Sequence, residues 1–187
     1  AARDVAQKLG DIAIDLVYVP VTPCRIFDTR VVGGPITANS TRNFDITSIA
    51  NYSVQGGDSS DCNGVGSIGD FAAAAINFTV VSPAGAGFIT AFPYLASRPL
   101  TATLNYNAGD VKGNLGIIKL DQSVAAPELS VYSFAQSDVV GDIVGYFINP
   151  QATAPECVGV TPSSFTITAG ATSFFNNPAC PAGYRAA

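Results

Sequence analysis

Two stretches decide the fold, Val17-Tyr-Val-Pro-Val-Thr-Pro-Cys-Arg-Ile-Phe-Asp-Thr-Arg30 and Asp138-Val-Val-Gly-Asp-Ile-Val-Gly-Tyr-Phe147. Both are rich in β-branched and aromatic residues and carry a few polar side chains, which is typical of β-strands. They enclose a long segment of strand-like runs that Gly and Pro interrupt. We therefore expect the first and last strands of one domain to close a single sheet system.

The enclosed segment predicts one strand after another at short, fairly even spacing. The runs 76–81 and 88–92, joined by the Gly-containing turn 82–87, predict a hairpin. Many short strands with regular turn signals are typical of a β-sandwich or jelly roll. The further predicted strands are 101–106, 115–120, 129–134 and 139–147. The sequence thus predicts an all-β, sandwich-like domain over residues 20–149.

Strand-forming extensions are predicted at both ends of this domain. In the N-terminal extension, residues 1–19, apolar side chains alternate with polar or small ones from Asp11 onward, as in a half-buried strand. Pro20 and Pro23 then limit that strand to a sheet edge or end. The C-terminal extension, residues 150–187, predicts a linker followed by a disulfide-bonded hairpin. The alternating positions of the N-terminal strand are Ile12, Ile14, Leu16 and Tyr18.

Cysteine usage and the ends of the sequence favour an oxidising compartment. The chain begins Ala-Ala and contains no Met, which fits cleavage of a secretory signal. Four cysteines allow three disulfide connectivities, and local pairing of Cys24 with Cys62 and of Cys157 with Cys180 would close loops of a few tens of residues. The alternative is four reduced, buried thiols, whereas zinc is disfavoured because the chain has no His. The cysteines are Cys24, Cys62, Cys157 and Cys180. We predict a secreted, extracellular or cell-surface protein.

Charge excludes several classes of partner. The net charge of −5 and a charged fraction of only 12% argue against nucleic acid, which requires a basic surface. No apolar run is long enough to span a membrane, so we expect no membrane insertion. The partners left are copies of the same chain and, as an alternative, glycans.

The motifs also resemble a module of bacterial secreted and cell-surface proteins whose function is largely uncharacterised. The resemblance rests on the opening Thr-Pro-Cys-Arg-Ile-Phe-Asp-Thr-Arg of residues 22–30 and the closing Asp-x-x-Gly-Tyr-Phe strand of residues 142–147. Residues 74–83 and 98–106 add to it. It covers roughly residues 17–148 and implies an extracytoplasmic, non-catalytic β module, without implying a substrate.

The sequence offers little catalytic equipment. Without His, the Ser-His and Cys-His nucleophile arrangements are excluded. A glycosidase needs two facing carboxylates, and its sugar cleft usually adds Trp, which is also absent. We expect Asp28 to form a structural ion pair with Arg30 or Arg98, and Asp142 to be a semi-buried carboxylate with its partners satisfied. We therefore predict no enzyme and no cofactor.

Calcium and sugars are two further ligand classes that the sequence could suit. Asp58, Asp61 and Asn63 gather oxygen ligands in a Gly-rich loop and form a weak calcium candidate, although their spacing is not that of an EF-hand. A polar turn anchored by Cys62 is the simpler interpretation, so we predict no metal. Exposed aromatic rings would suit sugars, and the candidates are Tyr52, Tyr94, Tyr106, Tyr132 and Tyr146.

The terminal extensions favour self-assembly over these alternatives. A strand-forming segment outside a sandwich can add to the open sheet edge of a neighbour. If the contact does not close on itself, it generates a filament. The alternative is that both extensions fold back on their own domain. The sequence therefore predicts an extracellular structural subunit that assembles through terminal strand addition. A secreted carbohydrate-binding or adhesive module is the alternative function.

Overall fold

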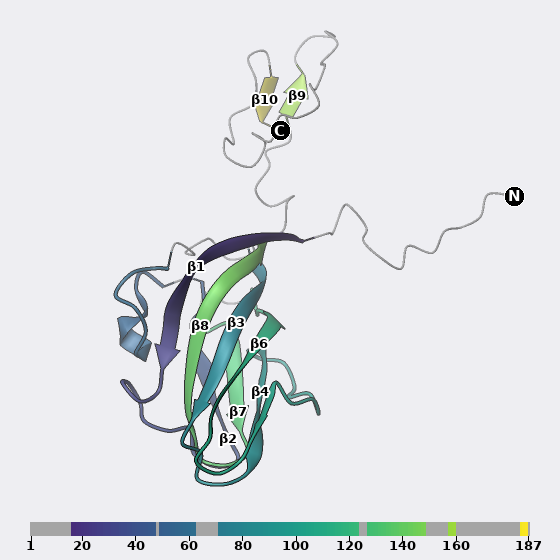
Figure 1. Cartoon of the computed structure of the whole chain (residues 1–187). Coiled ribbons are helices and arrows are strands. Elements are labelled where there is room, and N and C mark those ends of the chain that lie inside the picture. Colours follow the sequence, from purple (N-terminus) through teal and green to yellow (C-terminus); the bar gives the residue numbers. More distant parts are fainter. Residues whose placement is uncertain are drawn as a thin grey trace, which may run out of the picture. The chain divides into compact units, whose positions relative to one another are not determined.

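The computed structural model describes residues 16–47, 49–62, 71–123 and 127–148, together with the backbone of the short strands 157–159 and 184–186. The chain divides into one unit, Tyr18–Ile148, and a second made of Ala1–Val17 and Asn149–Ala187. The first unit is a β-sandwich of two four-stranded antiparallel sheets (Figure 1). The predicted all-β sandwich fold is confirmed.

The first sheet contains both stretches that enclose the domain. Its strand order is β1-β8-β3-β6, so β1 and β8 are hydrogen-bonded neighbours, as the sequence predicted (Figure 1). β6 forms the edge opposite β1. The strands are β1 (Val17–Asp28), β8 (Asp138–Ile148), β3 (Phe71–Val81) and β6 (Val111–Lys119).

The second sheet has the order β2-β7-β4-β5. Its central strand β7 is buried along its whole length of five residues. The edge strands of this sheet are β2, with five residues, and β5, with three. The strands are β2 (Ser40–Phe44), β7 (Leu129–Ser133), β4 (Gly87–Pro93) and β5 (Leu104–Tyr106). A 3-10 helix, η1 (Tyr52–Gln55), lies between β2 and β3 in the sequence.

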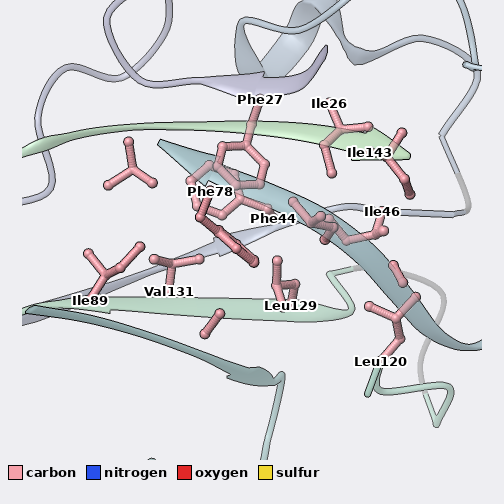
Figure 2. Packing of buried hydrophobic residues seen from close by; sticks show 14 of the residues in the cluster. Ile26, Phe27, Phe44, Ile46, Phe78, Ile89, Leu120, Leu129, Val131 and Ile143 are labelled. Atoms are coloured by element: carbon pink, nitrogen blue, oxygen red, sulfur yellow. The ribbon is translucent and has the colours of Figure 1, made fainter. Parts of the chain in front are cut away.

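Buried side chains of both sheets meet in one core (Figure 2). Phe27 of β1 stacks on Phe44 of β2 with ring centroids 3.9 Å apart, which joins the two sheets directly. The Phe78 ring of β3 lies 6.3 Å from that of Phe27. Each fully buried side chain of this size stabilises the fold by about 1.5–3 kcal/mol. The aliphatic residues around these rings are Ile26, Ile46, Ile89, Leu120, Leu129, Val131 and Ile143.

A β-bulge in β8 reverses which side chains face the core. Ala75 of β3 lies opposite Gly145, but the next residue, Ile76, lies opposite Ile143, so Val144 is an extra residue in β8. Because side chains alternate along a strand, one extra residue turns the pattern over. Ile143 and Tyr146 therefore both face the core, with exposed fractions of 0% and 2%, although three positions separate them.

The predicted hairpin of residues 76–81 and 88–92 is wrong. β3 pairs with β6 and β8, whereas β4 pairs with β5 and β7 in the other sheet. The connection from β3 to β4 crosses between the sheets. Backbone hydrogen bonds to other loops hold it: Ser82 N donates to Asp110 O (2.9 Å) and Ala84 N to Gln136 O (2.8 Å). Ser82 adopts φ +47°, which turns the chain out of β3.

The second unit contains one described strand pair. β9 (Cys157–Gly159) and β10 (Tyr184–Ala186) pair antiparallel, with Arg185 opposite Val158. The rest of the predicted C-terminal extension and residues 1–15 of the N-terminal extension lie outside the described residues.

Candidate functional site

A polar network holds the end of β1 against β8. Asp28 is buried and accepts hydrogen bonds from Arg30 Nε (2.9 Å), Arg30 Nη2 (2.6 Å) and the Arg30 backbone N–H (3.0 Å). Arg25 adds a bond from Nη1 to the Asp28 carboxylate (3.1 Å), and its Nε donates to Asp142 Oδ1 (2.9 Å). Arg25 thereby bridges the carboxylates of two neighbouring strands.

The electrostatics of this network keep Asp28 ionised. The hydrogen bonds from the Arg30 side chain hold the pKa of Asp28 below its usual range, against the opposing effect of burial. Both carboxylate oxygens accept from guanidinium groups, so the carboxylate has strong, charge-assisted partners. Such a group is suited to hold strands together, and a general base would need a freer lone pair.

A second contact ties the same strand ends. Thr29 Oγ1 donates to Asp138 Oδ1 (2.7 Å) and accepts from the backbone N–H of Val139 (2.9 Å). The Thr29 backbone N–H also donates to the Val139 carbonyl (3.1 Å). The opening Asp-Thr-Arg and the start of the closing strand are thus linked at successive residues.

The structure joins three of the four predicted network residues. Asp28 and Arg30 are paired directly, and Asp142 is reached through Arg25, which sequence reasoning missed. The expected participation of Arg98 is wrong: its guanidinium carbon lies 4.0 Å from the centroid of the Tyr132 ring, in the second sheet. A cation over an aromatic face is favourable in its own right.

A buried glutamate forms another polar site that sequence reasoning missed. Glu128 has an exposed fraction of 0%, and its carboxylate accepts from the backbone N–H of Ile46 (2.7 Å) and from Thr47 Oγ1 (2.6 Å). Tyr52 Oη donates to the Ile46 carbonyl (2.6 Å). These bonds fix the segment that follows β2, because each one ends on Ile46 or Thr47.

Two buried tyrosines beside this segment resist ionisation. Burial raises the pKa of Tyr146 to about 12, and it raises the pKa of Tyr52 further. Their exposed fractions are 2% and 0%. A phenol kept neutral in the core acts as a hydrogen-bond donor and packing group.

The disulfide and its loop cover the outer edge of β1. Cys24 and Cys62 form a disulfide, which is one of the two local pairs that the sequence allows. The cross-linked segment returns to β1 through a bridge between Phe27 and Gly56 and a hydrogen bond from Asp58 N to Arg25 O (2.8 Å). Whether Cys157 pairs with Cys180 falls outside the described residues.

The calcium candidate is not assembled within the described residues. Asp58 Oδ1 accepts from the backbone N–H of Ser60 (2.8 Å), and hydrogen bonding with Ser60 lowers the pKa of Asp58. Asn63 lies outside the described residues, and Asp61 is described without a cation-binding cluster around it. Among the residues that the structure describes, no group of three or more His, Cys, Asp or Glu could hold a metal ion.

The tyrosines weighed as sugar platforms are mostly buried, which corrects that expectation. Only Tyr94 is half-buried, and the exposed fractions of Tyr52, Tyr106, Tyr132 and Tyr146 are 0, 4, 9 and 2%. An unpredicted aromatic group lies on the second sheet instead. There Phe88 packs against Phe134 (5.3 Å) and Tyr132 (5.9 Å) between ring centroids, and Phe134 is 46% exposed.

The predicted assembly strand is described only at its end. Leu16 is 42% exposed and Tyr18 is 43% exposed, whereas Ile12 and Ile14 lie outside the described residues. Tyr18 belongs to β1 of its own sheet: its Oη donates to the Val144 carbonyl (3.0 Å) and its ring covers Gly145. Tyr18 therefore anchors the N-terminal end of β1 to β8. It belongs to the sheet of its own chain and does not pair with a neighbouring molecule.

β6 presents a sheet edge that no other described strand covers. Its register with β3 is continuous from Lys119 to Val111, and Ser82 N–Asp110 O and Leu120 N–Ala72 O bonds extend that ladder at both ends. Because hydrogen-bonded pairs alternate in an antiparallel ladder, the even-numbered residues of β6 bond to β3. The backbone groups of the odd-numbered residues therefore point away from the sheet: Val111, Gly113, Leu115, Ile117 and Lys119.

The same alternation places an apolar stripe on the outer face of β6. Lys112 lies opposite Val80, which is buried in the core, so the even-numbered side chains share the core side. The odd-numbered side chains lie on the outer face. Among them Val111 is 71%, Leu115 55% and Ile117 61% exposed.

The other sheet edges are less available to a new strand. β1 is covered near Arg25–Phe27 by the disulfide-linked loop and carries Pro20 and Pro23, which cannot donate. β2 and β5 have five and three residues. β6 has nine residues and no proline. It is the longest uncovered edge in the described part of the chain.

No helix within the described residues is long and apolar enough to cross a membrane. Comparison of the chain with models of protein families, with curated proteins and with solved structures finds no match to any of them. The resemblance to bacterial secreted modules therefore stays a prediction. The polar networks and the β6 edge are characterised by their geometry alone.

Proposed function

We propose that the chain is an extracellular structural subunit that assembles with copies of itself into a filament, fibre or sheath by adding a terminal strand to a neighbouring sheet. One observation carries this proposal: β6 is a nine-residue edge with outward backbone groups and an exposed apolar stripe. Natural proteins usually shorten, cover or interrupt such edges, because they recruit further strands. An edge left open in this way is suited to pairing.

The chemistry of the chain supports a structural role outside the cell. The Cys24–Cys62 disulfide is of the kind that persists in oxidising compartments. The polar clusters around Asp28 and Glu128 connect strands and loops within the sandwich. The proposal accordingly assigns the protein no catalytic reaction.

The test is polymer formation by the full chain, with two matched variants. Leu115→Glu adds one charge to the outer face of β6, whereas Leu95→Glu adds the same charge at a turn where the side chain is 67% exposed. Electron microscopy and light scattering over a range of concentrations should show polymers for the unmodified chain and for Leu95→Glu. Leu115→Glu should remain monomeric. Monodisperse monomers of the unmodified chain at every concentration would refute the proposal.

Carbohydrate binding is the second candidate, and the aromatic group of the second sheet is the observation that favours it. The Phe134 ring is 46% exposed and contacts Phe88, which gives a small apolar surface for a sugar face. The face of Tyr132 is occupied by Arg98, so fewer rings are available than in a usual sugar platform. Glycan-array binding that Phe134→Ala abolishes and Phe134→Tyr retains would support this function.

A further inference from the structure

Within that proposed function, the open edge of β6 and the sequence pattern of residues 11–16 together specify a contact. We propose that residues 11–16 of a second copy add as an antiparallel strand to β6, with their apolar side chains over the outer face. This inference rests on the proposed self-assembly and specifies its contact. Four observations carry it: reach, apolar pattern, side-chain size and charge.

The short length of chain between Leu16 and the anchored Tyr18 excludes pairing of residues 11–16 with β6 of the same molecule. Tyr18 is fixed to β8 by its hydrogen bond to Val144, so Leu16 lies two residues from an anchored position. Two residues span at most ~7 Å, whereas β1 and β6 are separated by three strand spacings, ~14 Å. Leu16 cannot lie along its own β6. A segment pairing over its whole length must come from another molecule.

The apolar pattern of the segment matches that of the edge. In residues 11–16 the even-numbered side chains are Ile12, Ile14 and Leu16, and the odd-numbered ones are polar or small. β6 has its apolar side chains at odd positions on the outer face. Strand addition that places both apolar sets on one face extends the exposed stripe into a two-strand surface and removes apolar area from water.

Side-chain size selects one antiparallel register. With Leu16 opposite Val111, Ile14 falls opposite Gly113, and Ile12 falls opposite Leu115. Gly113, which has no side chain in the stripe of β6, thus lies opposite a β-branched residue. On the core side Ala13 falls beside Asn114, whose amide donates to the Thr103 carbonyl (2.8 Å), and the small Ala side chain leaves room for that bond.

Charge supports the same register. Asp15 falls opposite Lys112, and both side chains are then on the core side of the strand pair. Opposite charges directly across a strand pair are favourable, and like charges are not. Asp15 and Lys112 also form a pair that exchanges no backbone hydrogen bonds, where the Cα atoms are about 4.5 Å apart. That separation is within the range a disulfide can bridge.

Cross-linking of the full chain tests the contact directly. Chains carrying Asp15→Cys and differently tagged chains carrying Lys112→Cys are mixed and oxidised. We expect a disulfide-linked dimer with one copy of each. The matched control replaces Lys112→Cys by Thr41→Cys, an exposed position on the edge strand β2, and should give no such dimer. Equal yields in the two mixtures, or no dimer with Lys112→Cys, would overturn the inference.

A backbone variant gives an independent readout. Leu115→Pro removes an N–H that points away from β3, so the β3–β6 ladder is retained and only the open edge is blocked. Leu115→Thr keeps that N–H. We expect Leu115→Pro to abolish the cross-link between Asp15→Cys and Lys112→Cys, and Leu115→Thr to retain most of it. Circular dichroism of both variants checks that the sandwich is folded.

The results separate this inference from the proposed function. Polymers without the cross-link to Lys112→Cys would leave self-assembly standing and refute this donor and register. The cross-link without polymers would establish the contact and refute the filament. Absence of both would refute the two proposals together.

Discussion

A Cβ atom added to Gly141 would lie 2.3 Å from the ring of Phe27, so that ring occupies the space that any side chain on Gly141 would need. Phe27 is fully buried and stacked on Phe44, and it cannot move aside without opening the core. We expect Gly141→Ala to lower the free energy of unfolding by about 1–3 kcal/mol, as overpacking of a core does. Urea denaturation measures the loss.

Gly145→Ala is the matched control, because it adds the same methyl group four residues later on the same strand. Its Cβ would meet the ring of Tyr18 at 2.4 Å, but Tyr18 is 43% exposed, so its ring can shift toward solvent while the backbone of β1 stays in the sheet. We expect a smaller loss than for Gly141→Ala, about 0.5–1 kcal/mol, because the shift costs only the hydrogen bond from Tyr18 Oη to the Val144 carbonyl. Equal losses for the two variants would contradict the different surroundings described for the two glycines.

The disulfide should contribute strongly to the stability of the sandwich. Cys24 and Cys62 are separated by 38 positions. Closing a loop of this length reduces the entropy of the unfolded chain and so raises its free energy by about 4 kcal/mol at room temperature. We expect the double variant Cys24→Ala/Cys62→Ala to lose a comparable free energy of unfolding. Denaturation followed by circular dichroism measures it, and a loss below about 1 kcal/mol would contradict this role.

Acid should weaken the polar network around Asp28 at the end of β1. The pKa of Asp28 is held down by Arg30 in the folded state, whereas an unfolded Asp titrates near about 3.9. A depressed folded pKa means that the stabilisation is present above the unfolded pKa and is lost as pH falls through the folded value. The free energy of unfolding should therefore fall below about pH 4. Asp28→Asn should be less stable at neutral pH and show a shallower fall in acid.

Alkali should reveal the buried tyrosines. The pKa of Tyr146 is raised to about 12 and that of Tyr52 is raised as well, whereas an unfolded Tyr titrates near about 10. For a raised pKa the stabilisation is complete below the unfolded value and is lost as pH rises through the folded one. In an ultraviolet titration of the seven tyrosines, these two should ionise last, together with unfolding.

The variant Tyr52→Phe isolates one of these groups. It removes a late-titrating phenol and the hydrogen bond to the Ile46 carbonyl, and should cost about 1 kcal/mol of unfolding free energy. A single transition near pH 10 for all tyrosines of the unmodified chain would show that the burial of Tyr52 and Tyr146 has been misassigned.

The sequence predicts strands well here because alternation is a local property. Residues 138–147 form a strand as predicted. This strand, β8, pairs with β1, and the sequence suggested that pairing because the two strands open and close the domain. The extra residue Val144 could not be predicted, because a bulge leaves no mark in a run of apolar side chains. The hairpin at residues 82–87 failed for a related reason: Ser, Pro and Gly suit a turn within a sheet and a crossing between sheets equally.

The polar site shows the same division. The Asp28–Arg30 pair lies within two residues and could be predicted from proximity in the sequence. The link from Arg25 to Asp142 depends on strand register, which composition does not reveal. The predicted exposure of the tyrosines was wrong for the same reason. Burial of a side chain depends on which face of its strand meets the other sheet.

In the first sheet, a disulfide-linked loop covers β1 near Arg25–Phe27, whereas no described strand covers β6. A polymer that joins an N-terminal segment to β6 would therefore have two chemically different tips. One tip always offers an unoccupied β6, and the other always offers an unpaired segment. Growth can then proceed at different rates at the two tips. A chain that retains its segment but has a blocked β6 would terminate one tip and leave the other active.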